Sequence, residues 1–312
     1  MTIKVLVTGG AGYLGSILTE HLLKAGYQVT IVDTLMYGQH SLFHLCAHPT
    51  FEFVMGDVRD ETLMRRLVKD ADVIIPLAAI VGAPACDRDP WLARSVNLEA
   101  IQLLNRLRSP EQLVVFPNTN SGYGAKSGDV FCTENSSLDP ISLYGQLKVQ
   151  AEQELLNNPN TIVLRLATVF GMSPRMRLDL LVNHFVYTAV TDRYLVIFEK
   201  DFKRNYIHIR DVADCFLHCI AHAGTMKGRP YNVGLDDANL SKAELAAKIQ
   251  IYIPGFYVHF SDIGSDPDKR NYIVSNQRLR DAGFEAQRSL DDGIQELLKG
   301  YRMLGRSPWK NV

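Results

Sequence analysis

The sequence predicts an α/β protein built on a doubly wound parallel sheet, with a smaller lobe formed by its C-terminal part. Three observations predict this class. Apolar, β-branched runs alternate with helical patterns through the first half of the chain, a glycine-spaced turn follows the first run, and an acidic residue ends the second. With 312 residues and 46% hydrophobic content, the chain can bury a large core as one domain or as two lobes.

The first apolar run, residues 5–8, leads into a turn that predicts a site for a dinucleotide. Gly9 lets the chain turn sharply, Gly12 lets a pyrophosphate approach the backbone, and Gly15 lets the next helix pack closely on the strand. The N-terminus of that helix, residues 16–23, then faces the anion. Glycines alone would fit a tight turn in a parallel sheet equally well. The interpretation therefore depends on the residues that follow.

The second strand, residues 28–32, ends at Asp33, which selects the cofactor. A carboxylate at this position can accept hydrogen bonds from the adenosine ribose hydroxyls. It would repel a 2'-phosphate, and residues 34–36 supply no Arg or Lys to receive one. The sequence therefore favours NAD over NADP.

The next two predicted strands, residues 51–54 and 72–79, add further contacts. Asp57 follows the third strand, where it could bond the adenine amino group or cap the helix that begins near residue 60; the sequence leaves both open. The small side chains of Ala78 and Ala79 would let the nicotinamide half of the dinucleotide pass close to the backbone. In the helix predicted from Pro90 towards residue 107, the amide of Asn97 could face solvent or hold a buried water near a catalytic lysine.

The fifth strand, residues 112–116, runs into a segment with hydroxyl groups at Thr119 and Ser121. The helix predicted over residues 142–156 carries Tyr144 and Lys148 one turn apart, on one face. A free tyrosine, with a pKa near ~10, is a poor base at neutral pH, but a nearby ammonium favours the phenolate. Such a pair also occurs by chance on solvated helix surfaces. Behind a matching cofactor loop, it predicts a base, its electrostatic partner and a Thr119 hydroxyl that orients a substrate alcohol.

Composition excludes several classes of function. Lys and Arg total 33 against 34 Asp and Glu, so no strong field favours nucleic acid or a membrane surface. The chain begins directly with a strand, and no apolar run is long enough to span a bilayer, so we expect a cytoplasmic protein without a signal peptide. The five cysteines lack metal or redox spacing, and no metal site is expected; Cys215 and Cys219 favour core packing.

These motifs resemble those of the extended short-chain dehydrogenases/reductases of the nucleotide-sugar epimerase/dehydratase group. The matching segments follow the family's order along nearly the whole chain: residues 8–15, Asp33, 56–58, 77–79, Asn97, 119–124, 144–148, 165–171 and 204–212. The resemblance implies a Rossmann fold, Tyr144 as base, Lys148 as its partner, Thr119 orienting a sugar and Arg204 contacting its diphosphate. The predicted cofactor contacts are Gly9, Gly12, Tyr13, Leu14, Gly15, Asp33, Asp57, Val58, Leu77, Ala78, Ala79, Asn97, Tyr144 and Lys148.

Departures from the family pattern narrow the activity. In the 4,6-dehydratase branch an Asp-Glu pair follows the threonine, whereas this chain has Asn120 and Ser121, which cannot serve as general acids at neutral pH. Dehydration is therefore disfavoured, and oxidation at C4 remains, alone or followed by re-reduction. Pro76 stands where a histidine is common, and the proline that usually follows the Gly171 turn is displaced to Pro174, which puts local loop geometry in doubt.

A closer resemblance points to the subgroup that contains the GDP-manno-heptose C4 dehydrogenases of bacterial capsule assembly. It is carried by residues 81–84, 118–124, 174–183 and 266–270. The predicted substrate contacts are Thr119, Asn120, Ser121, Arg175, Asn183, Arg204 and Arg270, with Arg177 a further candidate. The arginines are candidates for contacts to the diphosphate, because guanidinium groups suit phosphate oxygens. For any one of these arginines a surface ion pair is an equally good explanation, and Arg204 is the best supported because the residues around it also match.

The sequence thus predicts an NAD-dependent enzyme that oxidises C4 of a nucleotide-linked sugar, with GDP-linked sugars favoured. A 4-epimerase is the alternative, because it uses the same groups. A rival of another class is an NAD-sensing regulator, which has no need to keep Tyr144, Lys148 and Thr119. We expect residues 1–171 to form the NAD-binding domain, with 206–235 returning to it, and 172–312 to form mainly the substrate-binding lobe. A homodimer is expected, because the helices around residues 91–107 and 142–156 are apolar beyond one stripe.

Overall fold

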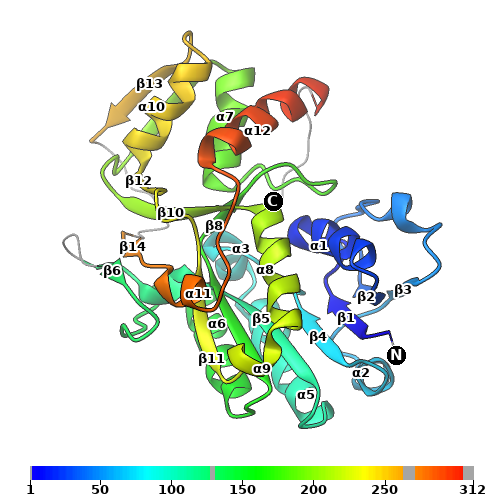
Figure 1. Cartoon of the computed structure of the whole chain (residues 1–312). Coiled ribbons are helices and arrows are strands. Elements are labelled where there is room, and N and C mark those ends of the chain that lie inside the picture. Colours follow the sequence, from blue (N-terminus) through cyan, green and yellow to red (C-terminus); the bar gives the residue numbers. More distant parts are fainter. Residues whose placement is uncertain (1, 127–130, 263–270, 305–312) are drawn as a thin grey trace.

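The computed structural model describes residues 2–126, 131–262 and 271–304, and it is organised around a seven-stranded parallel sheet (Figure 1). The strand order is β11-β7-β5-β4-β1-β2-β3, and every pairing is parallel. The strands are β1 (Lys4–Thr8), β2 (Gln28–Asp33), β3 (Phe51–Met55), β4 (Val73–Pro76), β5 (Leu113–Thr119), β7 (Thr161–Leu166) and β11 (Arg229–Val233). The predicted fold class is confirmed.

Helices cover both faces of this sheet, and alternate side chains of each strand explain how. On β1, Val5 and Val7 are buried against α1 (Tyr13–Lys24) and α8 (Ile209–Ala221), whereas Leu6 belongs to a second core on the opposite face. The helices of that second face are α2 (Glu61–Lys69), α5 (Ala100–Leu107) and α6 (Leu143–Leu156). Apolar side chains therefore fill most of the space on both faces of the sheet.

The helix predicted from Pro90 towards residue 107 is present, but it is not α-helical throughout. It consists of α4 (Pro90–Arg94), a π-helical turn η2 (Ser95–Glu99) and α5, and it follows the short helix α3 (Ala83–Arg88). Asp89 caps α4 by accepting a hydrogen bond from Leu92 N at 2.9 Å. The π turn contains Asn97, and such turns are frequent at functional sites.

The sequence of residues 161–170 also predicts a single sixth strand, and this prediction is wrong in its extent, because the chain changes sheets at Ala167. β7 ends at Leu166 in the central sheet, and β8 (Thr168–Phe170) pairs instead with β10 (Lys203–His208), which also pairs with β12 (Asn239–Ser241). The amide of Ala167 still donates to Val233 O at 2.9 Å. The switch carries the chain from the central sheet towards the second lobe.

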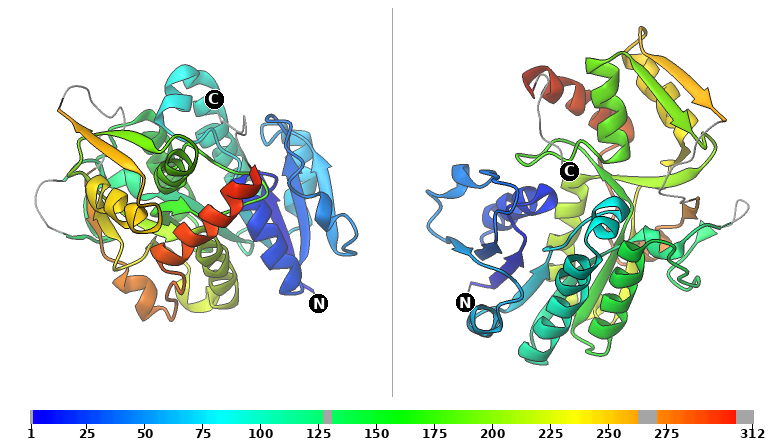
Figure 2. Two further views of the ribbon diagram at one scale, coloured as in Figure 1. Left: turned by 90° about the horizontal axis from the view of Figure 1, so that it is seen from above. Right: turned by 180° about the vertical axis from the view of Figure 1, so that it is seen from behind.

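The second lobe lies beyond the carboxyl edge of the sheet (Figure 2). Its helices are α7 (Leu181–Thr191), α10 (Lys242–Tyr252) and α12 (Leu290–Leu304), beside the strand pair β9 (Tyr194–Phe198) and β13 (Tyr257–Ser261). The remaining elements are short: η1 (Phe43–Leu45), η3 (Asn120–Tyr123), β6 (Phe131–Cys132), α9 (Ala223–Met226), β14 (Ile273–Val274) and α11 (Gln277–Asp281). Within the described ranges, none of the helices combines the length and apolar character that a membrane span requires.

Candidate active site

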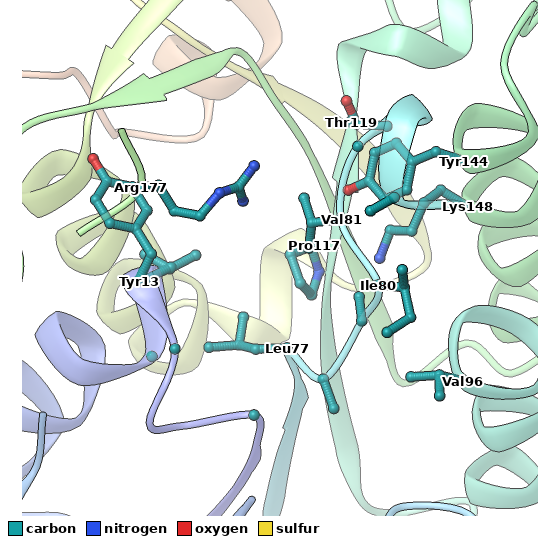
Figure 3. A pocket seen from close by; sticks show the side chains of 18 of the residues that line it. Tyr13, Leu77, Ile80, Val81, Val96, Pro117, Thr119, Tyr144, Lys148 and Arg177 are labelled. Atoms are coloured by element: carbon teal, nitrogen blue, oxygen red, sulfur yellow. The ribbon is translucent and has the colours of Figure 1, made fainter. Parts of the chain in front are cut away.

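A cavity of about 710 Å³ lies where the carboxyl ends of the central strands meet the second lobe (Figure 3). Residues at or just after the ends of six parallel strands line it: Gly9, Asp33, Asp57, Leu77, Thr119 and Leu166. Open α/β sheets bind ligands at this edge. The second lobe closes the cavity with residues of the loop before α7 and with Arg204.

The turn that follows β1, residues 9–15, is called the phosphate loop below, and its three spaced glycines differ in the space that surrounds them. Gly9 has φ +69°, and a Cβ on it would lie 2.6 Å from Ala78 N; a Cβ on Gly15 would lie 2.6 Å from both Gly9 O and Gly10 Cα. At both positions the protein's own backbone leaves no room for a side chain. Gly12 is different: its φ is −78°, and an added Cβ would meet only Gly9 O, at 3.1 Å. Space beside Gly12 is therefore left for a ligand, at the open N-terminus of α1.

Asp33 is fixed at the end of β2 by two main-chain hydrogen bonds. Its carboxylate accepts from Ala11 N at 3.0 Å and from Leu35 N at 2.8 Å. Burial raises the pKa of Asp33, and these backbone donors oppose that effect. The carboxylate is thus held in place at the cavity wall, where the sequence predicts the adenosine ribose.

Asp57 also lines the cavity, and its role as a helix cap is wrong. The cap of α2 is Asp60, which accepts from Leu63 N at 3.0 Å. Asp57 instead takes a forked pair from Arg59, with Nε at 3.0 Å and Nη2 at 2.6 Å, and this contact lowers the pKa of Asp57. Asp57 and Val58 therefore stay as predicted adenine contacts, with Arg59 beside them.

Asn97 does not face solvent, and it does not line the cavity. It is 1% exposed; its Oδ1 accepts from Ile80 N at 2.8 Å and its Nδ2 donates to Ile80 O at 2.8 Å. The amide therefore pins the loop after β4, whose residues Leu77, Ala78 and Ala79 do line the cavity. Its predicted contact with the cofactor site is, in this structure, indirect.

The three predicted catalytic residues come together in the cavity. Thr119 ends β5, and Tyr144 and Lys148 project from α6, whose N-terminus Ser142 caps through Gly145 N at 3.2 Å. The Tyr144 hydroxyl and the Lys148 ammonium both point towards the cavity (Figure 3). The Thr119 hydroxyl lies 2.9 Å from that of Ser121. Two separate stretches of sequence thus meet at one reaction centre.

Lys148 is the most perturbed cation of the site. It is 4% exposed, and its Nζ lies 3.8 Å from the centre of the Phe116 ring. Burial lowers the pKa of Lys148 to about 7, although the carboxylate of Glu152 opposes the effect. Its charge is therefore easily altered by its surroundings near neutral pH.

The predicted substrate residues divide into two groups. Thr119, Ser121, Arg175 and Arg204 line the cavity, whereas Arg270 lies outside the described residues. Asn183 does not line it: its Oδ1 accepts from Gly171 N at 3.1 Å and its Nδ2 donates to Arg177 O at 3.0 Å. This amide supports the cavity wall from behind.

Asn120 is enclosed next to the cavity. It is 0% exposed, it does not line the cavity, and neither of its amide atoms finds a hydrogen-bond partner in the described part of the chain. Its predicted contact with the substrate stays a prediction.

Arg177 is a site residue that the sequence marked only as a candidate. It points into the cavity opposite Tyr144 (Figure 3), and it pairs with Asp179 through Nε at 2.8 Å and Nη2 at 2.5 Å. Its Nη1 makes no hydrogen bond to the described ranges of the chain. Burial lowers the pKa of Arg177, but Asp179, Tyr144 and Tyr13 raise it above its ordinary value. The guanidinium is therefore charged, with donors left for a ligand.

Tyr13 and Leu14 lie at the start of α1 and line the cavity, and Tyr13 also ties the two lobes together. Its hydroxyl donates to Gly171 O at 2.7 Å, and its carbonyl accepts from Ser173 Oγ at 2.7 Å. Arg175, on the same loop, stacks over the Tyr37 ring at 5.0 Å. The loop between β8 and α7 is thus fastened over the phosphate loop.

This cavity fits a dinucleotide with a redox centre beside a Tyr–Lys pair, which defines a dehydrogenase/reductase of the nucleotide-binding class. The space beside Gly12, the open N-terminus of α1 and the fixed Asp33 carboxylate suit the pyrophosphate and ribose. Tyr144 and Lys148 lie at the other end, where the nicotinamide would reach.

Comparison with known proteins gives the family. The model of the NAD dependent epimerase/dehydratase family matches residues 5–234, so the chain belongs to that family. It is an enzyme of the extended short-chain dehydrogenase/reductase type, and its cofactor is NAD.

Relatives of this chain carry several names. The chain is 30% identical to "Uncharacterized UDP-glucose epimerase YtcB" of Bacillus subtilis, over 93% of this chain and 95% of that one. It is 28% identical to "Low-salt glycan biosynthesis protein Agl12" of Haloferax volcanii, over 95% and 98%. The fold matches UDP-glucuronic acid 4-epimerase of Bacillus cereus with a TM-score of 0.84, at 24% identity over 97% of this chain and 100% of that one.

Proposed function

We propose that this enzyme oxidises C4 of a nucleotide-linked sugar, and that the sugar is of the GDP-manno-heptose type. The observation that supports it is the meeting of Thr119, Tyr144 and Lys148 in the cavity that holds the phosphate loop. A non-catalytic NAD sensor would have no use for this arrangement. The domain boundaries given above and the homodimer belong to the same proposal; α4, on which Trp91 is 72% exposed, and α6 would supply the subunit contact.

The reaction follows from the side chains present. Bound NAD supplies the hydride acceptor. Thr119 holds the C4 hydroxyl, and the Tyr144 oxygen takes its proton as the C–H bond breaks. Lys148 stabilises the phenolate and bonds a ribose hydroxyl. Phe116 and the walls of the cavity exclude water from the ammonium, so its effect on Tyr144 is not screened.

The substrate end is defined by three arginines. Arg177 and Arg204 are 9% and 4% exposed and line the cavity, and Arg175 lies near its rim against Tyr37. We assign Arg177 and Arg204 to the diphosphate, because forked guanidinium groups suit phosphate oxygens. A GDP-linked heptose is favoured by the subgroup resemblance of residues 81–84 and 118–124, which also contribute to the cavity wall.

A 4-epimerase is the second candidate, and the relatives favour it specifically. One is named UDP-glucose 4-epimerase, from Lactobacillus helveticus, at 27% identity over 85% of this chain. An epimerase would use the same Tyr144 and Thr119, and would return the hydride after the keto sugar turns over. Dehydration stays disfavoured, because Asn120 and Ser121 offer no general acid.

The test is incubation of the purified enzyme with NAD and UDP-, dTDP-, CDP- and GDP-linked sugars, with NADH read by absorbance and products by NMR and mass. We expect a 4-keto product and stoichiometric NADH from a GDP-linked heptose. A 4-epimer without net NADH would establish the epimerase instead. Tyr144→Phe should lower the rate about 10²–10⁴-fold with NAD binding retained. Full turnover in this variant, or NAD binding without turnover on any sugar, would refute the proposal.

A further inference from the structure

Behind the catalytic residues lies a buried ion pair that is not part of the wall of the active-site cavity. Glu152, one turn beyond Lys148 on α6, pairs with Arg165 on β7: Oε1 accepts from Nη2 at 2.6 Å and Oε2 from Nε at 3.2 Å. The side chains are 3% and 5% exposed. Burial lowers the pKa of Arg165, but Glu152 and Tyr123 raise it above its ordinary value, so the guanidinium is charged.

The same carboxylate reaches the second catalytic element. Glu152 Oε2 accepts a short hydrogen bond from Asn118 Nδ2, and Asn118 Oδ1 in turn accepts from the amide of Thr119 at 2.8 Å. Asn118 is 3% exposed and immediately precedes Thr119 on β5. One carboxylate therefore stands between the helix that carries Tyr144 and Lys148 and the strand end that carries Thr119.

The far side of the pair is closed by the Tyr123 hydroxyl and a main-chain carbonyl, and beyond them the Glu134 carboxylate accepts from Asn232 N at 2.8 Å. Arg165 Nη1 donates to the Tyr123 hydroxyl at 3.0 Å and to Glu134 O at 3.2 Å, and the Tyr123 hydroxyl donates to Asn232 at 2.6 Å. The hydrogen bonds of the network are thus satisfied from β5 to β11.

Other ionisable groups around Lys148 are few in the described part of the chain. The inward-facing ones, besides Glu152 and Arg165, are Tyr144, Tyr123 and the buried thiol of Cys86, and the buried Glu134 carboxylate lies beyond Arg165. Arg108 is tied to carbonyls at the opposite end of α6, at Leu155 and Asn160. The remaining charges on the neighbouring helices α3 to α5 are exposed: Asp87, Arg88, Arg94, Glu99 and Arg106.

We propose that Glu152 and Arg165 form a positioning pair for catalysis, in which Glu152 is the counter-charge of the Lys148 ammonium and Arg165 limits that effect. The proposal rests on the proposed function for its consequence on rate, but not for its effect on Lys148 itself. Through Asn118, the same pair fixes the Thr119 backbone next to the Tyr144 helix.

Removing Glu152 and removing Arg165 should shift the pKa of Lys148 in opposite directions. Lys148 titrates near neutral pH because burial disfavours its charged form and Glu152 favours it. Without the Glu152 charge, Lys148 loses its proton at lower pH. Without Arg165, the Glu152 charge is no longer neutralised by its ion-pair partner, so Lys148 keeps its proton to higher pH. If the ion pair had only a structural role, its two substitutions would not shift the pKa of Lys148 in opposite directions.

The experiment uses the NAD-loaded enzyme labelled with ¹³C at lysine Cε. Lys148 is identified by the signal lost in Lys148→Met, and its titration is followed by NMR. We expect Glu152→Gln to move the midpoint down by about one pH unit. We expect Arg165→Met to move it up by a smaller amount, because Arg165 acts on Lys148 mainly by neutralising Glu152. The matched controls Glu152→Asp and Arg165→Lys keep the charges and should leave the midpoint close to that of the parent enzyme. The alkaline limb of the pH–rate profile should move in step.

Shifts of the same sign, or no shift, would overturn the proposal and leave a structural ion pair. If the single variants do not fold, the double variant Glu152→Gln/Arg165→Met can be used, because it leaves no uncompensated buried charge. The titration midpoint of Lys148 in this variant should still lie below that of the parent enzyme. An unchanged midpoint would overturn the proposal. The NMR readout needs no sugar. Opposite shifts without turnover would therefore refute the proposed function alone, and turnover with unchanged titration would refute this inference alone.

Discussion

Gly12→Ala should separate cofactor binding from folding. The backbone at Gly12 has φ −78° and ψ −174°, which alanine adopts without strain, and the new Cβ would meet only Gly9 O, at 3.1 Å. Replacing glycine at a compatible position stabilises a protein by about 0.4–1 kcal/mol through the unfolded chain. That gain offsets the one tight contact, so we expect a free energy of unfolding within about 1 kcal/mol of the parent.

The cost should appear in NAD affinity. A methyl group beside Gly12 keeps a pyrophosphate away from the N-terminus of α1, where the helix dipole contributes about 1 kcal/mol and one hydrogen bond to a charged group about 2 kcal/mol. Their loss, about 3 kcal/mol, corresponds to roughly a 10²-fold higher Kd for NAD. Isothermal titration calorimetry gives the affinity, and thermal unfolding without NAD gives the stability.

Gly15→Ala is the matched control with the opposite outcome. Its Cβ would lie within 2.6–2.7 Å of three backbone atoms of Gly9 and Gly10, so α1 must move away from the loop. Overpacking of this kind costs about 1–3 kcal/mol, and Tm should fall by about 2–10 °C. If Gly12→Ala bound NAD as tightly as the parent enzyme, the assignment of this loop to the pyrophosphate would be refuted.

Two further substitutions test the ends of the cavity. Asp33→Asn should lower the preference for NAD over NADP at least tenfold in Kd ratio, because a carboxylate about 4 Å from a phosphate charge costs up to about 4 kcal/mol at an effective dielectric of 20; an unchanged ratio would mean that Asp33 does not face the ribose. Arg177→Met should raise the KM for the nucleotide sugar about tenfold or more with NAD affinity unchanged, and Arg177→Lys should raise it less. Equal KM values in all three enzymes would remove Arg177 from the substrate site.

The cofactor half of the site could be predicted from sequence because its requirements are local. Gly9 and Gly15 stand where the backbone itself leaves no room for a Cβ, and Asp33 is held by amides from its own turn and the phosphate loop. Such constraints leave a fixed spacing in the sequence. Tyr144 and Lys148 are likewise visible as neighbours on one helix.

The contacts of the Asn97 and Asn183 side-chain amides could not be predicted, because their partners are distant in sequence or belong to the main chain. Asn97 binds Ile80 and Asn183 binds Gly171, and both therefore support the cavity from behind instead of lining it. Neither backbone partner is marked by a residue type, because in both of these hydrogen bonds a main-chain N–H donates to the asparagine Oδ1. The change of sheets at Ala167 was hidden for a related reason. Apart from Arg165, residues 161–170 are all apolar or β-branched, as expected for one strand, and only the pairing of residues 168–170 with β10 divides them.

Helix α6 carries both residues that local spacing predicts and a residue whose partners are distant in sequence. Tyr144, Lys148 and Glu152 follow one another at four-residue intervals, so they form one stripe along the helix. The stripe begins at the cavity wall, passes the Phe116 ring and ends in the core at Arg165. A charged stripe can enter a core only where each charge is compensated, since an unpaired buried ion costs several kcal/mol. The acidity available to Tyr144 therefore depends on a carboxylate and a guanidinium that touch no ligand, and substitutions on β7, outside the cavity, should alter catalysis through charge.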